Sequence, residues 1–231
     1  HQDLSSEEDG IVIEIFKNRV EITNSGKPVL DQLHFLDGAP TIKNKRVFTE
    51  MKNLGLVDGQ GYGWRKIVKE LESRSLPAPE IKIRKNSITV TIWFEKLLKL
   101  LSLDQRNWTV YLHTVLRYLL NEPANNASLR QRLNLPESKS STVSKLFRQA
   151  AEGGLVKPFD QHSSNKTKKY LPAWSQASSR IPVKTKDYDK LKLEEEKTNN
   201  SQNSLSNKAF IGQEDDQLIQ KARQRLKELG I

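Results

Sequence analysis

The residues with the clearest chemistry in this sequence are hydroxyl, amide and cationic side chains between positions 139 and 169. Within the segment SSTVSKLFRQAAE, apolar residues recur at the spacing of one helical face: Val143, Leu146, Phe147 and Ala150. The polar residues in and just before this segment then face outward: Lys139, Ser140, Ser141, Thr142, Lys145, Arg148 and Gln149. Hydroxyl groups bind phosphate oxygens, and Lys, Arg and Gln side chains also read base edges in the major groove. This pattern predicts a helix that contacts double-stranded DNA.

Two earlier helical patterns would position that helix. Apolar residues stand at helical spacing in TVYLHTVLRYLLN (109–121) and in SLRQRLNL (128–135). Candidate N-caps precede the second of these patterns: Asn125, Asn126 and Ser128. Ser138 or Ser140 is expected to cap the helix that follows Pro136. Gly153 and Gly154 are expected to end that helix, because a left-handed closing residue favours glycine.

A β-hairpin is predicted directly after these glycines. LVKPF and KYLPAW are short strand patterns on either side of the polar turn HSSNKTK. The tip carries three cationic residues: Lys166, Lys168 and Lys169. Such a hairpin would reach the minor groove or the phosphates beside a helix-turn-helix. Three helices followed by a two-stranded wing form a winged helix-turn-helix, which we expect over residues 101–174.

The distribution of charge favours the same region. The chain has a net charge of +10, and residues 109–174 alone carry ten Lys and Arg residues against four Asp and Glu residues. A basic segment of this kind suits a polyanion, although ordinary solubility charge is the alternative. We also expect Arg130 and Arg132 to touch the DNA backbone. His113 is expected to lie on a helix surface, and His162 in a loop.

Composition excludes several functional classes. The sequence has no cysteine and four scattered histidines, so disulfides and thiolate metal sites are excluded and no metal site is expected. No apolar run is long enough to span a bilayer, and we expect a cytoplasmic protein without a membrane partner. No catalytic constellation or Walker-type loop is found, so we expect binding rather than catalysis. Because the chain begins at His1 rather than Met, we expect it to be a fragment of a longer protein.

The first hundred residues predict a separate α+β layer. Two hairpins are expected, at 11–23 and at 80–94, with helices at 47–56 and 64–73 between them. The segment EKLLKLLSL (95–103) predicts a joining helix. Gly59, Gly61 and Gly63 alternate just before the second helix, where bare backbone N–H groups could hold phosphate. A tight turn that packs a helix on a sheet is the alternative.

The order NRVEITNSGKPV, KNKRVFTEMKNLGLVDGQGYGWRKIVKEL, LPAPEI and ITVTIWF resembles one bacterial and archaeal family of transcriptional regulators. Their middle region is described as ATP-dependent DNA helicase RecG-like, C-terminal, and is a diverged GHKL (Bergerat-fold) ATP-binding domain. A Schlafen-type AlbA domain usually precedes it, and a winged helix follows. The resemblance implies that His1-Gln2-Asp3 ends the family's Asn-containing helix, so the metal-binding Glu and Asn would lie upstream.

This resemblance implies a weakened nucleotide site. The loop Asn24-Ser25-Gly26 stands where the family has an Asp in its first glycine box, which reads adenine. Gly59, Gly61 and Gly63 remain, with Lys27 and Arg65 as phosphate-binding candidates. We therefore expect no cofactor in this fragment, whereas the intact protein could bind ATP with Mg²⁺.

The remaining sequence predicts a linker and a terminal helix. Residues 175–211 are rich in Ser, Asn, Lys and Glu, which is typical of a disordered linker. Residues 212–231 place apolar side chains near helical spacing: Leu218, Ile219, Ala222, Leu226 and Leu229. This amphipathic helix would dock on a partner or on a second copy in a homo-oligomer, or pack back on its own protein.

Together these patterns predict an α+β chain in four parts: a partial GHKL-like sheet domain (1–100), a winged helix-turn-helix (101–174), a linker and a terminal helix. The predicted function is that of a DNA-binding transcription regulator. Two alternatives stay open, an ATP-binding switch or ATPase and an adaptor that assembles proteins through the winged helix and tail.

Overall fold

The computed structural model describes residues 10–28, 30–39, 41–57, 59, 61–94, 100–160, 163 and 168–176. All of them belong to one compact unit, residues 1–179. The expected terminal helix (212–231) and nearly all of the expected linker lie outside the described residues.

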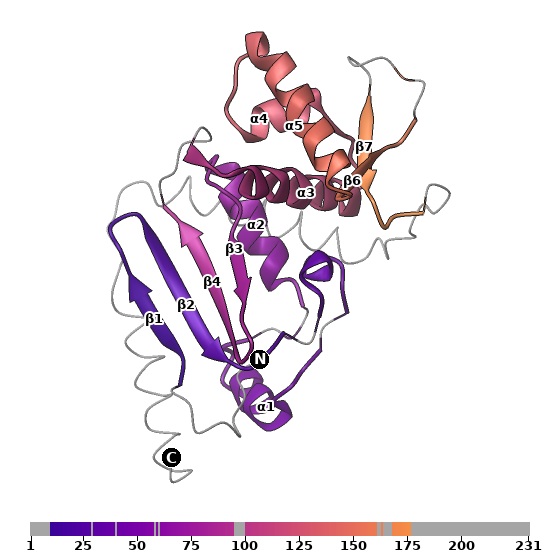
Figure 1. The fold of residues 1–231 in the computed structure, drawn as a ribbon. Coiled ribbons are helices and arrows are strands. Elements are labelled where there is room, and N and C mark those ends of the chain that lie inside the picture. Colours follow the sequence, from indigo (N-terminus) through magenta and orange to yellow (C-terminus); the bar gives the residue numbers. More distant parts are fainter. Residues whose placement is uncertain are drawn as a thin grey trace, which may run out of the picture. The chain divides into compact units, whose positions relative to one another are not determined.

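The first half of this unit contains an antiparallel four-stranded sheet (Figure 1). Its strands are β1 (Val12–Ile15), β2 (Arg19–Ser25), β3 (Glu80–Ile83) and β4 (Ser87–Trp93), in the order β1-β2-β4-β3. Side chains alternate between the two faces of a strand, so paired residues share a face. One row across all four strands is wholly aliphatic: Ile13, Ile22, Val90 and Ile81. The two hairpins expected from the sequence are confirmed.

Two helices lie between the hairpins in sequence. Helix α1 (Lys45–Asn53) is followed by Gly55 at φ +73°, a left-handed conformation that costs glycine little. Helix α2 (Gly63–Ser73) buries Val68 and Leu71, as its apolar spacing predicts, whereas Ile67 is only half-buried. A short 3-10 helix, η1 (Gln32–His34), precedes them.

The central element of the unit is helix α3 (Leu103–Leu119), which begins six residues before the predicted start at Thr109. Its N-cap is Ser102, whose hydroxyl accepts from the Gln105 backbone N–H while the Gln105 side chain accepts from Ser102 N–H. The predicted joining helix over 95–103 is therefore wrong at its C-terminal end, because Ser102 starts a new helix. Residues 95–99 of that prediction lie outside the described residues.

The second half continues with helices α4 (Asn126–Arg132) and α5 (Ser140–Glu152), joined through the 3-10 helix η3 (Glu137–Lys139). A three-stranded antiparallel sheet accompanies them, with the order β5-β7-β6. Its strands are β5 (Ala124–Asn125), β6 (Val156–Pro158) and β7 (Lys169–Pro172). The predicted hairpin after α5 is confirmed by the pairing of β6 with β7.

The helix ends agree with the sequence in part. Asn125 caps α4, because its side chain accepts from the Ser128 backbone N–H at 2.9 Å. The prediction that Ser138 or Ser140 caps α5 is wrong: Lys139 is the N-cap and forms no side-chain cap bond, because η3 leads directly into the helix. After α5, Gly154 takes a φ of +69°.

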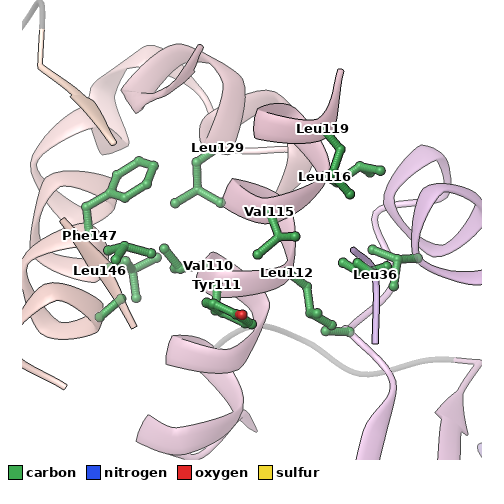
Figure 2. Close-up of a cluster of buried hydrophobic side chains, with 14 of the residues drawn as sticks. Leu36, Val110, Tyr111, Leu112, Val115, Leu116, Leu119, Leu129, Leu146 and Phe147 are labelled. Atoms are coloured by element: carbon green, nitrogen blue, oxygen red, sulfur yellow. The ribbon is translucent and has the colours of Figure 1, made fainter. Parts of the chain in front are cut away.

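A single apolar core joins both halves through α3 (Figure 2). One side of α3 packs against Leu129 of α4 and Phe147 of α5, and the other meets Leu36 and Val68. Helix α3 is therefore buried on nearly every side between Thr109 and Leu116.

Tyr111 of α3 anchors two loops at this core. Its hydroxyl donates to the Leu33 carbonyl and accepts from Trp174 Nε1 at 2.9 Å. Burial raises the pKa of Tyr111 to about 12, because the ionised phenolate would lose hydration.

The described residues thus form a mixed α/β fold with antiparallel sheets and five α-helices. No helix within the described ranges combines the length and the apolar character that crossing a bilayer requires.

Candidate nucleic-acid interface

Helix α5 separates an apolar face from a polar one. Val143, Leu146, Phe147 and Ala150 are buried in the core, which fixes the rotation of the helix about its axis. The outward residues are exposed: Lys139, Ser140, Ser141, Thr142, Lys145 and Arg148, with Gln149 half-buried. The structure therefore brings the predicted cationic and hydroxyl side chains together on one accessible face.

Arg148 is an exposed cation on this face. Its Nε lies 4.0 Å from Glu152 Oε1, and both side chains are 69% exposed. Ion pairs this exposed and this long contribute little energy, so Arg148 stays available to another anion. Lys145 is also exposed, one helical turn earlier.

The first turn of α5 is held by Asn126 of α4, a role that the sequence did not indicate. Asn126 Nδ2 donates to the Ser140 carbonyl at 2.8 Å and to Ser144 Oγ at 3.0 Å. Its Oδ1 accepts from Ser140 Oγ at 3.2 Å and from Arg130 Nε at 3.1 Å. Asn126 was one of three predicted caps of α4, but Asn125 performs that role. Ser140 is thereby engaged within the protein, whereas Ser141 and Thr142 are the exposed hydroxyls of this turn.

The β6–β7 hairpin lies beside α5 (Figure 1). The Tyr170 ring of β7 stacks on the Phe147 ring of α5, with centroids 4.1 Å apart and planes within 3°. Burial raises the pKa of Tyr170 above its usual value, which agrees with a ring held against the core. Because this stack fixes the hairpin to α5, both would approach a ligand as one surface.

The cations of the hairpin are described only in part. Lys169 is exposed and Lys168 half-buried, while Lys166 and His162 lie outside the described residues. Phe159, which sequence reasoning missed, is 57% exposed just beyond β6, and its N–H donates to the Lys169 carbonyl at 2.9 Å. An exposed aromatic ring where the turn of a lysine-bearing hairpin begins is a further candidate contact, because apolar side chains insert between base steps in the minor groove. The only sequence signal is a large apolar residue at the edge of a polar turn.

The expectation that Arg132 touches the DNA backbone is wrong. Arg132 is only 5% exposed, and its Nε lies 3.4 Å from Glu72 Oε1 of α2 without hydrogen-bond geometry. Its Nη2 donates to the Leu76 carbonyl, and Nη1 is buried without a partner. Burial lowers the pKa of Arg132, and the nearby Glu72 carboxylate opposes that effect. Arg130, by contrast, is half-buried and bound to Asn126.

The expectation that His113 lies on a helix surface is also wrong. His113 is 2% exposed and bridges two elements: Nδ1 lies 3.2 Å from Glu72 Oε2, and Nε2 lies 3.0 Å from Ser128 Oγ. Glu72 therefore holds α3 through His113 and α4 through Arg132. We call these four polar side chains the Glu72 cluster: Glu72, His113, Ser128 and Arg132. His113 and Arg132 are buried, and the other two are half-buried.

Gly59, Gly61 and Gly63 line a cavity of about 350 Å³ together with residues of α1. Gly59 and Gly61 have φ of +73° and +76°, and a Cβ on Gly59 would lie 2.9 Å from Phe48 Cζ. The left-handed φ of Gly59 and Gly61 favours glycine at both positions, which agrees with the tight-turn alternative, while Gly63 opens α2. Of the two cations expected nearby, Arg65 is engaged by the Leu36 carbonyl and the Tyr62 ring. Lys27 is exposed.

No group of three His, Asp or Glu side chains converges to hold a metal ion within the described ranges.

Comparison with known proteins gives one match. Residues 8–92 match the family described as "Putative ATP-dependent DNA helicase recG C-terminal". The match covers the four-stranded sheet with α1 and α2, less than half of the chain, and ends before α3. A mixed α/β fold over these residues is consistent with an ATPase-like domain. No curated protein and no solved structure matches the chain.

Proposed function

We propose that this protein is a DNA-binding transcription regulator. In this proposal α4 and α5 form a helix-turn-helix, α5 enters the major groove, and the β6–β7 hairpin is the wing of a winged helix. Lys145, Arg148 and Gln149 read base edges, while Lys139, Ser141 and Thr142 contact phosphates. Lys166, Lys168 and Lys169 of the hairpin neutralise further phosphates.

The observation that carries the proposal is the exposed cationic face of α5 beside the lysine-bearing hairpin. A surface that binds another protein generally has an apolar centre, but the described outward face of α5 is polar, with hydroxyl, amide and cationic groups and the Glu152 carboxylate near its C-terminal end. This composition favours a polyanion over the adaptor alternative. The family description names a helicase, but we find no catalytic constellation among the described residues that would support helicase activity.

The test is the salt dependence of duplex binding by the whole chain, followed by fluorescence anisotropy. Each neutralised phosphate releases counterions, so about five contacts would lower the affinity by roughly 10²–10³-fold between about 50 and 200 mM salt. Binding that does not weaken with salt would contradict the proposal. Light scattering with and without DNA separates the adaptor, which would assemble proteins without DNA.

Nucleotide binding by the sheet region is the second candidate, and the family match together with the glycine-lined cavity favours it. Lys43 lines that cavity and would face a bound phosphate. ATP with Mg²⁺ should then raise the melting temperature saturably, by less in Lys43→Ala than in Lys45→Ala, whose side chain does not line the cavity. An unchanged melting temperature, or equal shifts in both variants, would count against it. A regulatory role for this region would agree with the proposed function, with ATP bound as an effector and not hydrolysed.

A further inference from the structure

One cavity among the described residues lies away from both the glycines and the cationic face of α5. Its volume is about 530 Å³, within the usual range for small-molecule sites. Strand β3 forms one wall, the first turns of α3 a second, and the corner between α5 and β6 a third. Because β3 is an outer strand of its sheet, its free edge borders this space.

The walls of the cavity are mainly apolar. Leu33, Ile81, Leu101 and Leu155 contribute aliphatic surface. Trp108 adds an indole whose Nε1 donates to the Pro79 carbonyl at 3.0 Å and whose ring stacks on Tyr111 at 5.2 Å. This ring is therefore fixed in place before any ligand arrives. A flat apolar group would be the natural occupant of such a space.

Two carboxylates line the cavity, those of Glu80 and Asp104. Glu80 Oε1 accepts from Trp93 Nε1 at 2.6 Å and from Gln105 Nε2, so its carboxylate is held rigidly at the wall. Asp104 lies exposed in the first turn of α3, and Lys82 is the one cation among the lining residues described. Among the described residues, the Asn107 carbonyl Oδ1 is buried and has no hydrogen-bond partner. Two carboxylates against one ammonium group, with an unpaired carbonyl, favour a ligand that carries N–H donors and a positive charge.

We propose that this cavity binds a small molecule that combines an aromatic or aliphatic ring with a cationic amine or amidine. The ring would pack against Trp108 and the aliphatic walls, and the cation would lie near Glu80 and Asp104. This site differs in place and in charge preference from the glycine-lined cavity, which would suit phosphate.

The position of the cavity also gives it a route to α5. Gly153 is the C-cap of α5 and Leu155 leads into β6, and both line the cavity. The Leu155 carbonyl accepts from Ala173 N–H at 3.0 Å, which ties this corner to the end of the hairpin. A ligand would therefore touch the junction from which both α5 and the hairpin extend. That it alters DNA binding rests on the proposed function, whereas binding itself does not.

Calorimetric titration of the whole chain tests the site directly. Benzamidine and tryptamine are the probes, and benzoate and indole-3-acetate carry the same rings with the opposite charge. We expect saturable binding of both cations and weaker binding of both anions. Asp104→Asn should weaken cation binding by about two- to fivefold, the range for one exposed ion pair, while Glu137→Gln on η3 should leave it unchanged. Because Asp104 is exposed, its variant should fold normally.

Three results would overturn the site: no saturable binding of either cation at millimolar concentration, equal binding of cations and anions, or equal affinity in Asp104→Asn and wild type. A duplex titration with and without benzamidine then tests the coupling. If duplex affinity does not change, the regulatory role fails while the ligand site stands. If the chain binds no duplex at all, the proposed function fails, and the calorimetric result still decides the ligand site.

Discussion

Two arginines of the α4–α5 region occupy opposite environments. Arg132, at the end of α4, is buried within the Glu72 cluster, whereas Arg148, in the middle of α5, is 69% exposed. Their sequence surroundings are similar, since each stands between a glutamine and a large apolar residue. Arg132 lies against Glu72 in the last turn of α2, whereas Arg148 lies beside Glu152 of its own helix. Basic residues near a predicted helix-turn-helix therefore divide into those that hold the region in place and those that can meet a ligand.

Removing Glu72, the carboxylate that both Arg132 and His113 contact, should have the largest effect on stability. Glu72→Ala would leave Arg132 and His113 buried without their carboxylate, and we expect a loss of about 3–5 kcal/mol in the free energy of unfolding. Glu152→Ala, which removes the exposed partner of Arg148, should change that free energy by less than about 0.5 kcal/mol. Equilibrium urea unfolding measures both. Similar losses in the two variants would remove the distinction between the arginines.

The exposed Arg148, with Lys145 one turn earlier, is expected to act in recognition of DNA sequence. Arg148→Ala and Lys145→Ala should each reduce discrimination between preferred and mismatched duplexes by about 1–3 kcal/mol, because base-edge contacts are lost. Neither should alter the unfolding midpoint. Lys52→Ala on α1 is the matched control, since it removes an exposed cation from a different helix. Unchanged discrimination in both α5 variants would exclude the groove assignment.

Removing the hydrogen bonds between α4 and α5 should have an intermediate effect on stability. Asn126→Ala removes the hydrogen bonds that join α4 to Ser140 and Ser144, and we expect about 1–2 kcal/mol of destabilisation. Gln131→Ala, at an exposed site on the same helix, controls for helix propensity. If thermal or urea unfolding gave equal stabilities for these variants, Asn126 would not be the bridge.

The smallest effect is expected from the hairpin. The double variant Lys168→Ala with Lys169→Ala should weaken all duplexes alike and lower the slope of log affinity against log salt by about two, one for each lost phosphate contact. A change in sequence preference instead would mean that the hairpin reads bases. The salt series with several unrelated duplexes distinguishes the two outcomes.

Local patterns predicted much of this architecture. The spacing of Val143, Leu146 and Phe147 fixed the orientation of α5 because one buried stripe determines where the other side points. Alternating strands and turn residues likewise predicted all the hairpins described. The early start of α3 was missed although Ser102-Leu103-Asp104-Gln105 has the capping-box pattern, because Leu103 and Trp108, the large apolar residues of its first turns, stand five positions apart and show no helical spacing.

Long-range contacts could not be predicted in this way. Glu72 meets His113 and Arg132 across 41 and 60 positions of sequence, and no local signal reports such pairs. The cavity beside Trp108 is likewise assembled from segments between Gln32 and Leu155. Burial of charged residues and the shape of cavities depend on which elements meet, and a single sequence contains that information only indirectly.

Hydrogen–deuterium exchange of the whole chain, with and without a saturating short duplex at low salt, tests the central claim most directly. If α5 and the hairpin bind DNA, the duplex should slow amide exchange in the first turns of α5 and in the β6–β7 hairpin, with no change in α1 or β1. Protection confined to the four-stranded sheet, or none anywhere when the duplex is bound, would contradict it.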